Sequence, residues 1–175
     1  MLFGAHVSAA GGISTAIDRA DELGCDAVQV FTQSPRMWKA TAHTDEELER
    51  FRIRRAEARI EYVVCHALYL VNLATPDRSM RAKSIAALRS SLETAAAIDA
   101  DGVVFHVGSH LGRGLRPALR RVVPALAELL ELTDDRLWLL LENAAGAGDT
   151  IGRSVDELAE IVDRLDGHPR LGICL

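Results

Sequence analysis

Short apolar runs alternate with longer amphipathic stretches along the whole chain. Between the runs, apolar residues recur at helical spacing, as at Ile13, Ala16, Ile17, Ala20 and Leu23. The runs have the length of strands and cover residues 2–7, 27–31, 136–141 and 171–175, with two more that end at His66 and His106. Strands that alternate with helices in this way predict βα units and a parallel sheet.

Capping signals mark where helices are expected to begin. Thr44 with Glu47, and Ser154 with Glu157, both fit the capping-box pattern. Thr75-Pro76 is expected to start a long helix with the proline in its first turn. These signals divide the chain into successive βα units and leave no linker between domains.

The predicted fold is α/β, a parallel βα barrel of the TIM-barrel type in a single domain over residues 1–175. A six-stranded open sheet would leave hydrophobic edges unpaired, whereas an eight-stranded barrel has no edges and typically needs about 250 residues. The chain ends at Leu175 within its sixth apolar run. We therefore expect a barrel that is incomplete at the C-terminus, truncated after the start of strand six.

The composition indicates a soluble globular protein of the cytoplasm, with no membrane partner. Of its 175 residues 49% are hydrophobic, enough for a substantial core, and every apolar stretch is too short to span a membrane. The N-terminus has neither a basic region nor a cleavage site, so we expect an unprocessed protein. Cys25, Cys65 and Cys174 are odd in number and widely spaced, which predicts buried thiols in a reducing compartment.

The charge balance gives no support to non-specific binding of nucleic acid. The formal net charge is -5, so a polyanionic partner would need local positive charge, which bound metal ions can supply. The helix expected after Thr44 carries arginines at positions 50, 52, 54, 55 and 59, interleaved with Glu49 and Glu57. This mixture of signs is typical of a solvated outer surface.

Three apolar runs lead directly into residues of types that commonly bind metal ions, namely His66, His106 and Glu142. Because the carboxyl ends of parallel strands meet at one rim of the sheet, we expect these side chains to lie close together. Side chains alternate along a strand, so their predecessors should pack against helices. Those predecessors are Cys65, Phe105 and Leu141. Two imidazoles and a carboxylate suit zinc or a similar divalent ion.

Other residues on the same rim leave alternatives open. His6 could bind a metal ion or orient a residue that does. The glycine-rich loop 107–114, which contains His110, could cradle a phosphate or be a flexible connection. The loop 32–39 combines Arg36 with Met37 and Trp38, a composition that suits insertion into a nucleic-acid groove, unless the tryptophan folds back over the barrel mouth. Tyr69 is a further aromatic residue of this rim.

At these positions the chain strongly resembles the endonuclease IV family of apurinic/apyrimidinic-site endonucleases, which are zinc-dependent βα barrels. The matching stretches are Gly4-Ala5-His6-Val7-Ser8-Ala9-Ala10-Gly11-Gly12, Arg36-x-Trp38, His66 with Tyr69 and Asn72, Phe105-His106-x-Gly108-Ser109-His110, and Glu142-Asn143-x-Ala145-Gly146. They span the chain in the family's order.

The resemblance implies a hydrolase that uses up to three zinc ions to cleave double-stranded DNA on the 5′ side of an abasic site. It implies that His66, His106 and Glu142 bind zinc, with Glu142 as the catalytic carboxylate that bridges two ions. Arg36 and Tyr69 would then belong to DNA-contacting loops. His6 and His110 are expected behind the zinc ligands, where they would orient them.

The chain also departs from the family's pattern. In the family, strand six continues beyond the point matching Leu175 into Asp-Ser/Thr-Cys-His, and later strands supply further ligands. Ala67 replaces an acidic residue that is common beside the matching histidine. We therefore expect fewer zinc ions and little or no turnover from this polypeptide alone.

Two other functions remain open from the sequence. The first is a barrel resembling sugar isomerases or epimerases, which would use one or two divalent ions on a small polyol, although this gives no reason for the Arg36 loop. The second is a non-catalytic half-barrel that binds one metal ion or none and self-associates through its exposed sheet edges. A complete enzyme of the family is expected to be a monomer.

Overall fold

Six parallel strands form one sheet in the computed structural model, which describes residues 1–175. The strands lie in chain order: β1 (Gly4–His6), β2 (Ala27–Phe31), β3 (Tyr62–His66), β4 (Gly102–His106), β5 (Trp138–Glu142) and β6 (Leu171–Cys174). The helices between them are α1 (Thr15–Glu22), α2 (Asp45–Glu57), α3 (Arg78–Ala97), α4 (Leu115–Leu130) and α5 (Val155–Asp163). The predicted alternation of strands and helices around a parallel sheet is confirmed.

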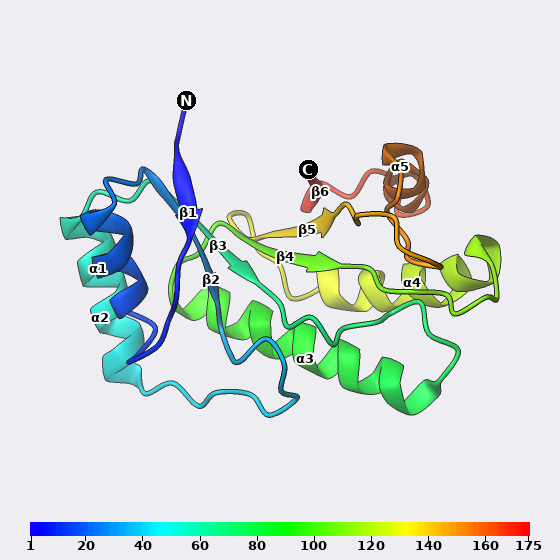
Figure 1. Cartoon of the computed structure of the whole chain (residues 1–175), viewed down its shortest axis with the longest axis horizontal. Coiled ribbons are helices and arrows are strands. Elements are labelled where there is room, and N and C mark those ends of the chain that lie inside the picture. Colours follow the sequence, from blue (N-terminus) through cyan, green and yellow to red (C-terminus); the bar gives the residue numbers. More distant parts are fainter.

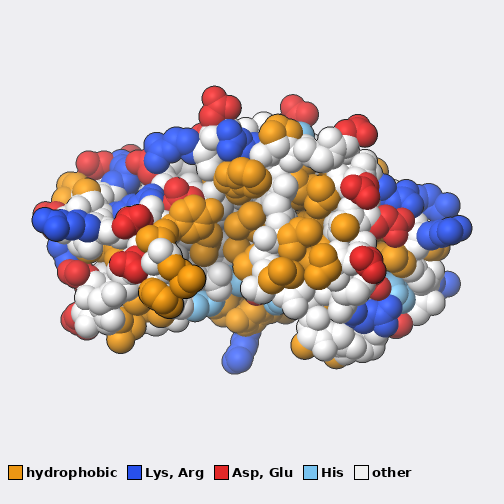
Figure 2. All heavy atoms as spheres, turned by 90° about the horizontal axis from the view of Figure 1, so that it is seen from above, with side chains coloured by type: hydrophobic (Ala, Val, Ile, Leu, Met, Phe, Trp, Pro, Cys, Tyr) orange, Lys and Arg blue, Asp and Glu red, His pale blue; other side chains and the backbone are white.

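The helices cover one side of the sheet. In Figure 1, α3 and α4 run beneath the sheet, α1 and α2 lie at its β1–β2 end, and α5 lies beside β6. The core fills the space between the helices and the sheet, where Phe51, Phe105 and Leu88 are fully buried. Hydrophobic side chains also gather in the middle of the opposite face (Figure 2). On β5, the partly exposed Trp138 and Leu140 alternate with the buried Leu139 and Leu141.

Most element boundaries match the sequence prediction within two residues, and the differences have local causes. The helix expected to start at Thr75-Pro76 begins later, at Arg78, because the Asp77 side chain accepts a hydrogen bond from the backbone N–H of Met80 and caps it. The expectation that Pro76 lies in the first turn was therefore wrong.

The two predicted capping boxes have different outcomes. Thr44 and Glu47 form both reciprocal hydrogen bonds at the start of α2. At α5 only one is present: Ser154 accepts from the N–H of Glu157, whereas the Glu157 carboxylate accepts from the N–H groups of Gly152 and Arg153. The Glu157 carboxylate is therefore bonded to the preceding loop instead of to the N–H of Ser154, as a full capping box would require.

Some arginines of α2 are structural rather than merely solvated. Arg55 donates to Asp101 at 2.7 Å, and the two side chains are only 14% and 23% exposed. The same Asp101 oxygen accepts from the N–H of Val63 at 2.8 Å, so this ion pair ties α2 to the starts of β3 and β4. Arg50 and Arg59 are exposed and form no ion pair, as expected for a solvated surface.

The cysteines are free, and only Cys65 is completely buried. Burial raises the pKa of its thiol to about 12, so it behaves as a small apolar residue of the core. Cys25 and Cys174 are partly exposed, so the expectation of buried thiols holds for one residue of the three. No helix combines the length and the hydropathy needed to cross a membrane.

Hydrogen bonds join the loops that follow β3, β4 and β5. The side-chain oxygen of Asn72 accepts from the N–H of Ser109 at 3.1 Å, and the N–H of Ile151 donates to the carbonyl of Gly108 at 2.9 Å. Gly108 has a φ of +104°, and a Cβ there would lie 2.3 Å from the Asn72 side-chain oxygen. The crossing of the first two loops therefore requires glycine at this position.

We expect Gly108→Ala to lower the free energy of unfolding by about 3 kcal/mol, because it adds steric overlap to an unfavourable φ. Gly24→Ala is the matched control, since Gly24 also has a positive φ, +69°, but a Cβ added there would have no atom within 4 Å. That control should cost about 1 kcal/mol. Urea denaturation measures both, and equal losses would show that the approach to Asn72 is unimportant.

Candidate metal centre

His66, His106 and Glu142 converge at the carboxyl ends of β3, β4 and β5. One ligand atom from each lies within 4.8 Å of the others. The Nε2 atoms of His66 and His106 are 3.0 Å and 3.2 Å from the same carboxylate oxygen, Oε2 of Glu142. The structure therefore brings together the three residues that the strand ends singled out.

The backbone determines how His66 presents its ring to Glu142. Its Nδ1 lies 2.6 Å from the carbonyl oxygen of Ala67, which can only accept, so Nδ1 carries a hydrogen. If the imidazole is neutral, Nε2 then directs a lone pair at the Glu142 carboxylate, 3.0 Å away. Two lone pairs at that distance repel, so a proton or a metal ion must lie between them.

The electrostatics of Glu142 agree with this requirement. The hydrogen bond with His66 lowers the pKa of the Glu142 carboxyl, and the charges of His106, His66 and His6 lower it further, while burial acts in the opposite direction. The carboxylate is therefore ionised near neutral pH and available to a cation. His106 has no such anchor, because its buried Nδ1 has no hydrogen-bond partner in the protein.

The chemistry of the donors fits zinc or another ion that accepts nitrogen and oxygen ligands. Two imidazole nitrogens and one carboxylate oxygen are a donor set found in catalytic zinc sites. Three protein ligands leave a coordination position free for water or substrate. The side chains of His106 and Glu142 are 40% and 25% exposed, so solvent reaches both of these residues.

His6 lies beside the cluster, with its ring centroid 6.0 Å from that of His66. The side-chain Nε2 of Gln29 is 2.8 Å from Nδ1 of His6, and since an amide nitrogen only donates, the hydrogen of the His6 ring is on Nε2. Desolvation and the charge of His66 lower the pKa of His6, which favours the neutral ring. This tautomer suits a hydrogen-bond donor better than a metal ligand.

Sequence reasoning missed Gln29 and Phe31. Both lie on β2, and Phe31 is directly opposite His66 in the ladder, with its ring centroid 5.2 Å from that of the histidine. The alternation of side chains along β2 could have placed both residues on the site's face of the sheet. It could not have shown that Gln29 contacts His6.

Tyr69 and the Arg36 loop are joined on the same rim. The N–H of Tyr69 donates to the carbonyl of Pro35 at 2.9 Å, and the Tyr69 ring lies 5.4 Å from the His66 ring between centroids. Arg36 is exposed, whereas Trp38 is partly buried against the core. Of the two arrangements open for Trp38, the structure shows the one in which it folds back.

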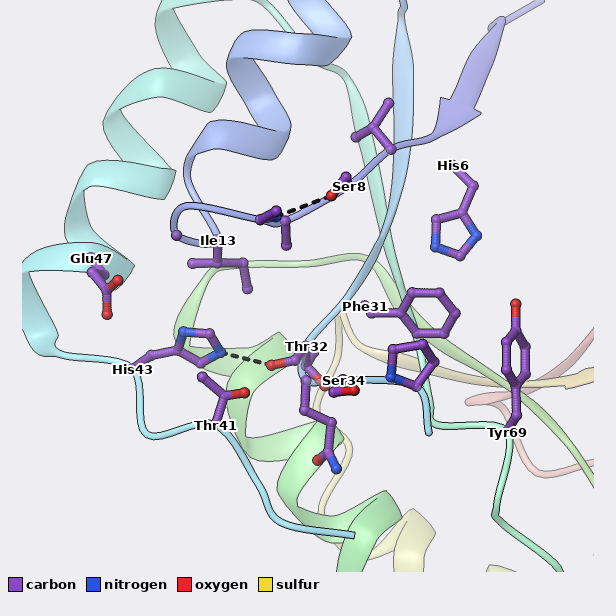
Figure 3. A pocket seen from close by; sticks show the side chains of 16 residues that line it. His6, Ser8, Ile13, Phe31, Thr32, Ser34, Thr41, His43, Glu47 and Tyr69 are labelled. Atoms are coloured by element: carbon purple, nitrogen blue, oxygen red, sulfur yellow. Dashed lines mark hydrogen bonds between the residues drawn. The ribbon is translucent and has the colours of Figure 1, made fainter. Parts of the chain in front are cut away.

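A pocket of about 900 Å³ opens next to the metal centre. Figure 3 shows His6, Phe31 and Tyr69 together at one side of it, with His43 and Glu47 at the other. The loops after β1 and β2 provide most of its lining. A ligand of the metal centre could therefore extend along these two loops.

His110 does not join the cluster. Its Nδ1 accepts from the N–H of Gly114 at 3.2 Å and lies 3.9 Å from a carboxylate oxygen of Asp149. The N–H of His110 donates to the carbonyl of the same aspartate at 3.0 Å. These contacts hold the glycine-rich loop 107–114 against the loop after β5.

Comparison with known proteins places the chain among TIM barrels. Residues 17–175 match the family described as xylose isomerase-like TIM barrel. A protein named "Probable endonuclease 4" from Halothermothrix orenii is 38% identical over 175 residues, which are 100% of this chain and 63% of the relative. Another of that name from Halorhodospira halophila is 40% identical over 98% of this chain and 59% of its own length. The chain thus spans about three fifths of these curated relatives.

Solved structures of TIM-barrel proteins also superpose on nearly the whole chain and extend beyond it. Endonuclease IV from Thermus thermophilus superposes with a TM-score of 0.86 at 36% identity, over 100% of this chain and 62% of that one. A D-psicose 3-epimerase superposes with a TM-score of 0.79 at 16% identity, over 99% of this chain and 62% of that one. The second likeness shows the fold alone.

We expect the chain to bind one divalent ion such as zinc, because the three ligand atoms of His66, His106 and Glu142 lie within 4.8 Å of one another. Calorimetric titration with ZnCl₂ measures the affinity and the number of ions bound. His66→Ala should weaken binding at least tenfold. His168→Ala, in the loop before β6, is the control and should bind like the unmodified chain, so equal weakening in the two variants would contradict a centre at His66.

Proposed function

The chain belongs to the xylose isomerase-like TIM barrel family, and we propose that it carries part of the active site of a zinc-dependent DNA-repair endonuclease that hydrolyses the phosphodiester 5′ to abasic sites. Relatives named endonuclease 4, at 38% and 40% identity, support this reading within the family. The observation that carries the proposal is the convergence of two histidines and one glutamate beside an exposed arginine loop and a tyrosine.

His66, His106 and Glu142 would hold the metal ion in this proposal. Bound zinc would supply a water molecule that ionises near neutral pH and a positive charge for the phosphate. The contact with Ala67 keeps the His66 ring in the orientation that offers Nε2 to the ion. Glu142 faces both histidines through one oxygen, so its other oxygen would be available to hold a further ion.

Arg36 and Tyr69 would face the DNA. The exposed Arg36 guanidinium can bind backbone phosphates, and the half-exposed Tyr69 ring stands beside the metal centre, where it can stack against a neighbouring base. An abasic nucleotide leaves the stack at low cost because it has no base to unpair. The hydrogen bond from Tyr69 to Pro35 holds these two contacts in one unit.

His6 and His110 take different parts in the proposal. His6, held by Gln29, would donate a hydrogen bond from Nε2 at the edge of the metal centre. His110 would act through the shape of its loop, to which it is bonded. The free cysteines agree with a reducing cytoplasm.

The first test is the affinity for DNA. In the presence of ZnCl₂, the chain should bind a fluorescent duplex with a tetrahydrofuran abasic analogue more tightly than the undamaged duplex, as measured by anisotropy. Tyr69→Ala should reduce that preference about tenfold, because one stacking contact is worth about 1–3 kcal/mol. Tyr62→Ala, at the opposite end of β3, is the matched control and should keep the preference. Equal affinity of the unmodified chain for the two duplexes would refute the proposed substrate.

The second test is cleavage. We expect little or no nicking of abasic duplex by the purified 175-residue chain with added zinc, because three protein ligands do not make up a three-ion centre. A gel assay of a duplex labelled at its 5′ end measures this, with a complete relative as the positive control. Turnover comparable to that of the relative would show that these three ligands suffice.

A further inference from the structure

Acidic residues are rare in two segments on one flank of the rim, although the chain carries a net charge of -5. From Tyr62 to Leu92 the only acidic residue is Asp77, and from Gly102 to Ala127 there is none. These two segments contain β3 with the start of α3, and β4 with most of α4. The first turns of the helices that follow His66 and His106 thus carry more basic than acidic residues, with Asp77 capping α3 and Asp149 lying 3.9 Å from His110 in the loop before α4.

Two arginines on this flank are held side by side without a carboxylate. Arg121 donates from Nε and Nη2 to the carbonyl of Ala74 at 3.0 Å and 2.6 Å. Arg81 donates to the next carbonyl, that of Thr75, at 2.9 Å. Carbonyl oxygens orient the guanidinium groups but do not neutralise them, and several of the five N–H donors of each group stay free.

Arg113 and Arg120 extend this group. Arg120 precedes Arg121 on α4, and Arg113 lies in the loop two residues before this helix. Burial lowers the pKa of Arg121, and the charges of Arg81, Arg120 and Arg113 lower it further. None of the four forms an ion pair, whereas Arg54 and Arg55 of α2 do. We refer to Arg81, Arg113, Arg120 and Arg121 as the flank patch.

The start of α4 adds to the positive potential. Its N-cap is Gly114, which offers no side chain, and Pro117 has no N–H, so the uncapped N–H groups of the first turn are those of Leu115 and Arg116. The helix spans 16 residues, and its dipole adds partial positive charge beside Arg113. Uncapped N–H groups and guanidinium donors together favour an anion with several oxygens, such as a phosphate.

The flank patch lies on the loops and helices that follow two of the metal-binding strands. His66 and His106 end the two strands whose following loops lead to α3 and α4. Those loops are joined by the bond between Ser109 and Asn72, two residues before Ala74. The flank patch therefore lies on the same rim of the sheet, further along it than the Arg36 loop.

We propose that the flank patch binds backbone phosphates of duplex DNA outside the lesion, which rests on the proposed function of the metal centre. DNA carries a negative charge about every 1.7 Å along its axis, so a duplex placed over the metal centre presents further phosphates to this flank. Phosphate contacts carry no sequence or lesion information. The flank patch thus raises affinity for damaged and undamaged DNA alike.

The test is the salt dependence of DNA binding by the 175-residue chain. The double variant Arg113→Gln/Arg120→Gln leaves the loop contacts of Arg81 and Arg121 intact. It should weaken binding to both abasic and undamaged duplexes about tenfold at low salt and reduce the slope of log K against log salt by about 1.8, the value for two phosphate contacts. The preference for the abasic duplex should not change.

Arg50→Gln/Arg59→Gln removes the same charge from exposed, unpaired arginines at α2 and its C-terminal end, so it is the matched control. Thermal melting verifies that both double variants are folded. Equal slopes in the two variants, or a loss confined to the abasic duplex, would overturn the role of the flank patch. Absence of DNA binding by the unmodified chain would instead refute the proposed function, so the two failures are distinguishable.

Discussion

The parallel ladder of β3, β4 and β5 is the constraint on which the site depends. Phe105 pairs with Leu141 and His106 with Glu142, so alternate side chains of both strands point to the same side of the sheet. A slip of one residue would turn the ligands toward the helices and the buried Phe105 and Leu141 toward solvent, which the hydrophobic core prevents. Asp101 supports this register where the strands begin, since its carboxylate binds the N–H of Val63.

Given that ladder, the charge state of the centre follows from a single backbone contact. The carbonyl of Ala67 keeps the hydrogen of the His66 ring on Nδ1, so the space between Nε2 and the Glu142 carboxylate requires a positive species. The nearby Gln29 has the opposite effect on His6, where it keeps the hydrogen on Nε2. Two histidines of similar appearance in the sequence thus acquire different chemistry from their hydrogen-bond partners.

This difference explains how much could be predicted from the sequence. Strand periodicity and strand ends are local properties, so they identified the three converging side chains and the barrel class, and the resemblance to endonuclease IV is confirmed by relatives at 38% and 40% identity. The tautomer of His6 and the burial of Trp38 depend on contacts between segments far apart in the chain. The predicted start of α3 was wrong because both Thr75 and Asp77 are residues that can cap a helix, and in the structure Asp77 is the N-cap.

Net charge was the least informative quantity, because it averages over arginines with different surroundings. On α2, Arg55 is neutralised by Asp101 and holds the fold together. On α3 and α4, Arg81 and Arg121 are held only by carbonyl oxygens, which leave their charge available to a partner. A chain with a net charge of -5 can therefore present a positive surface to DNA, provided that its carboxylates are kept to other parts of the molecule. The distribution of carboxylates, rather than the number of arginines, determines which flank of the rim can bind phosphate.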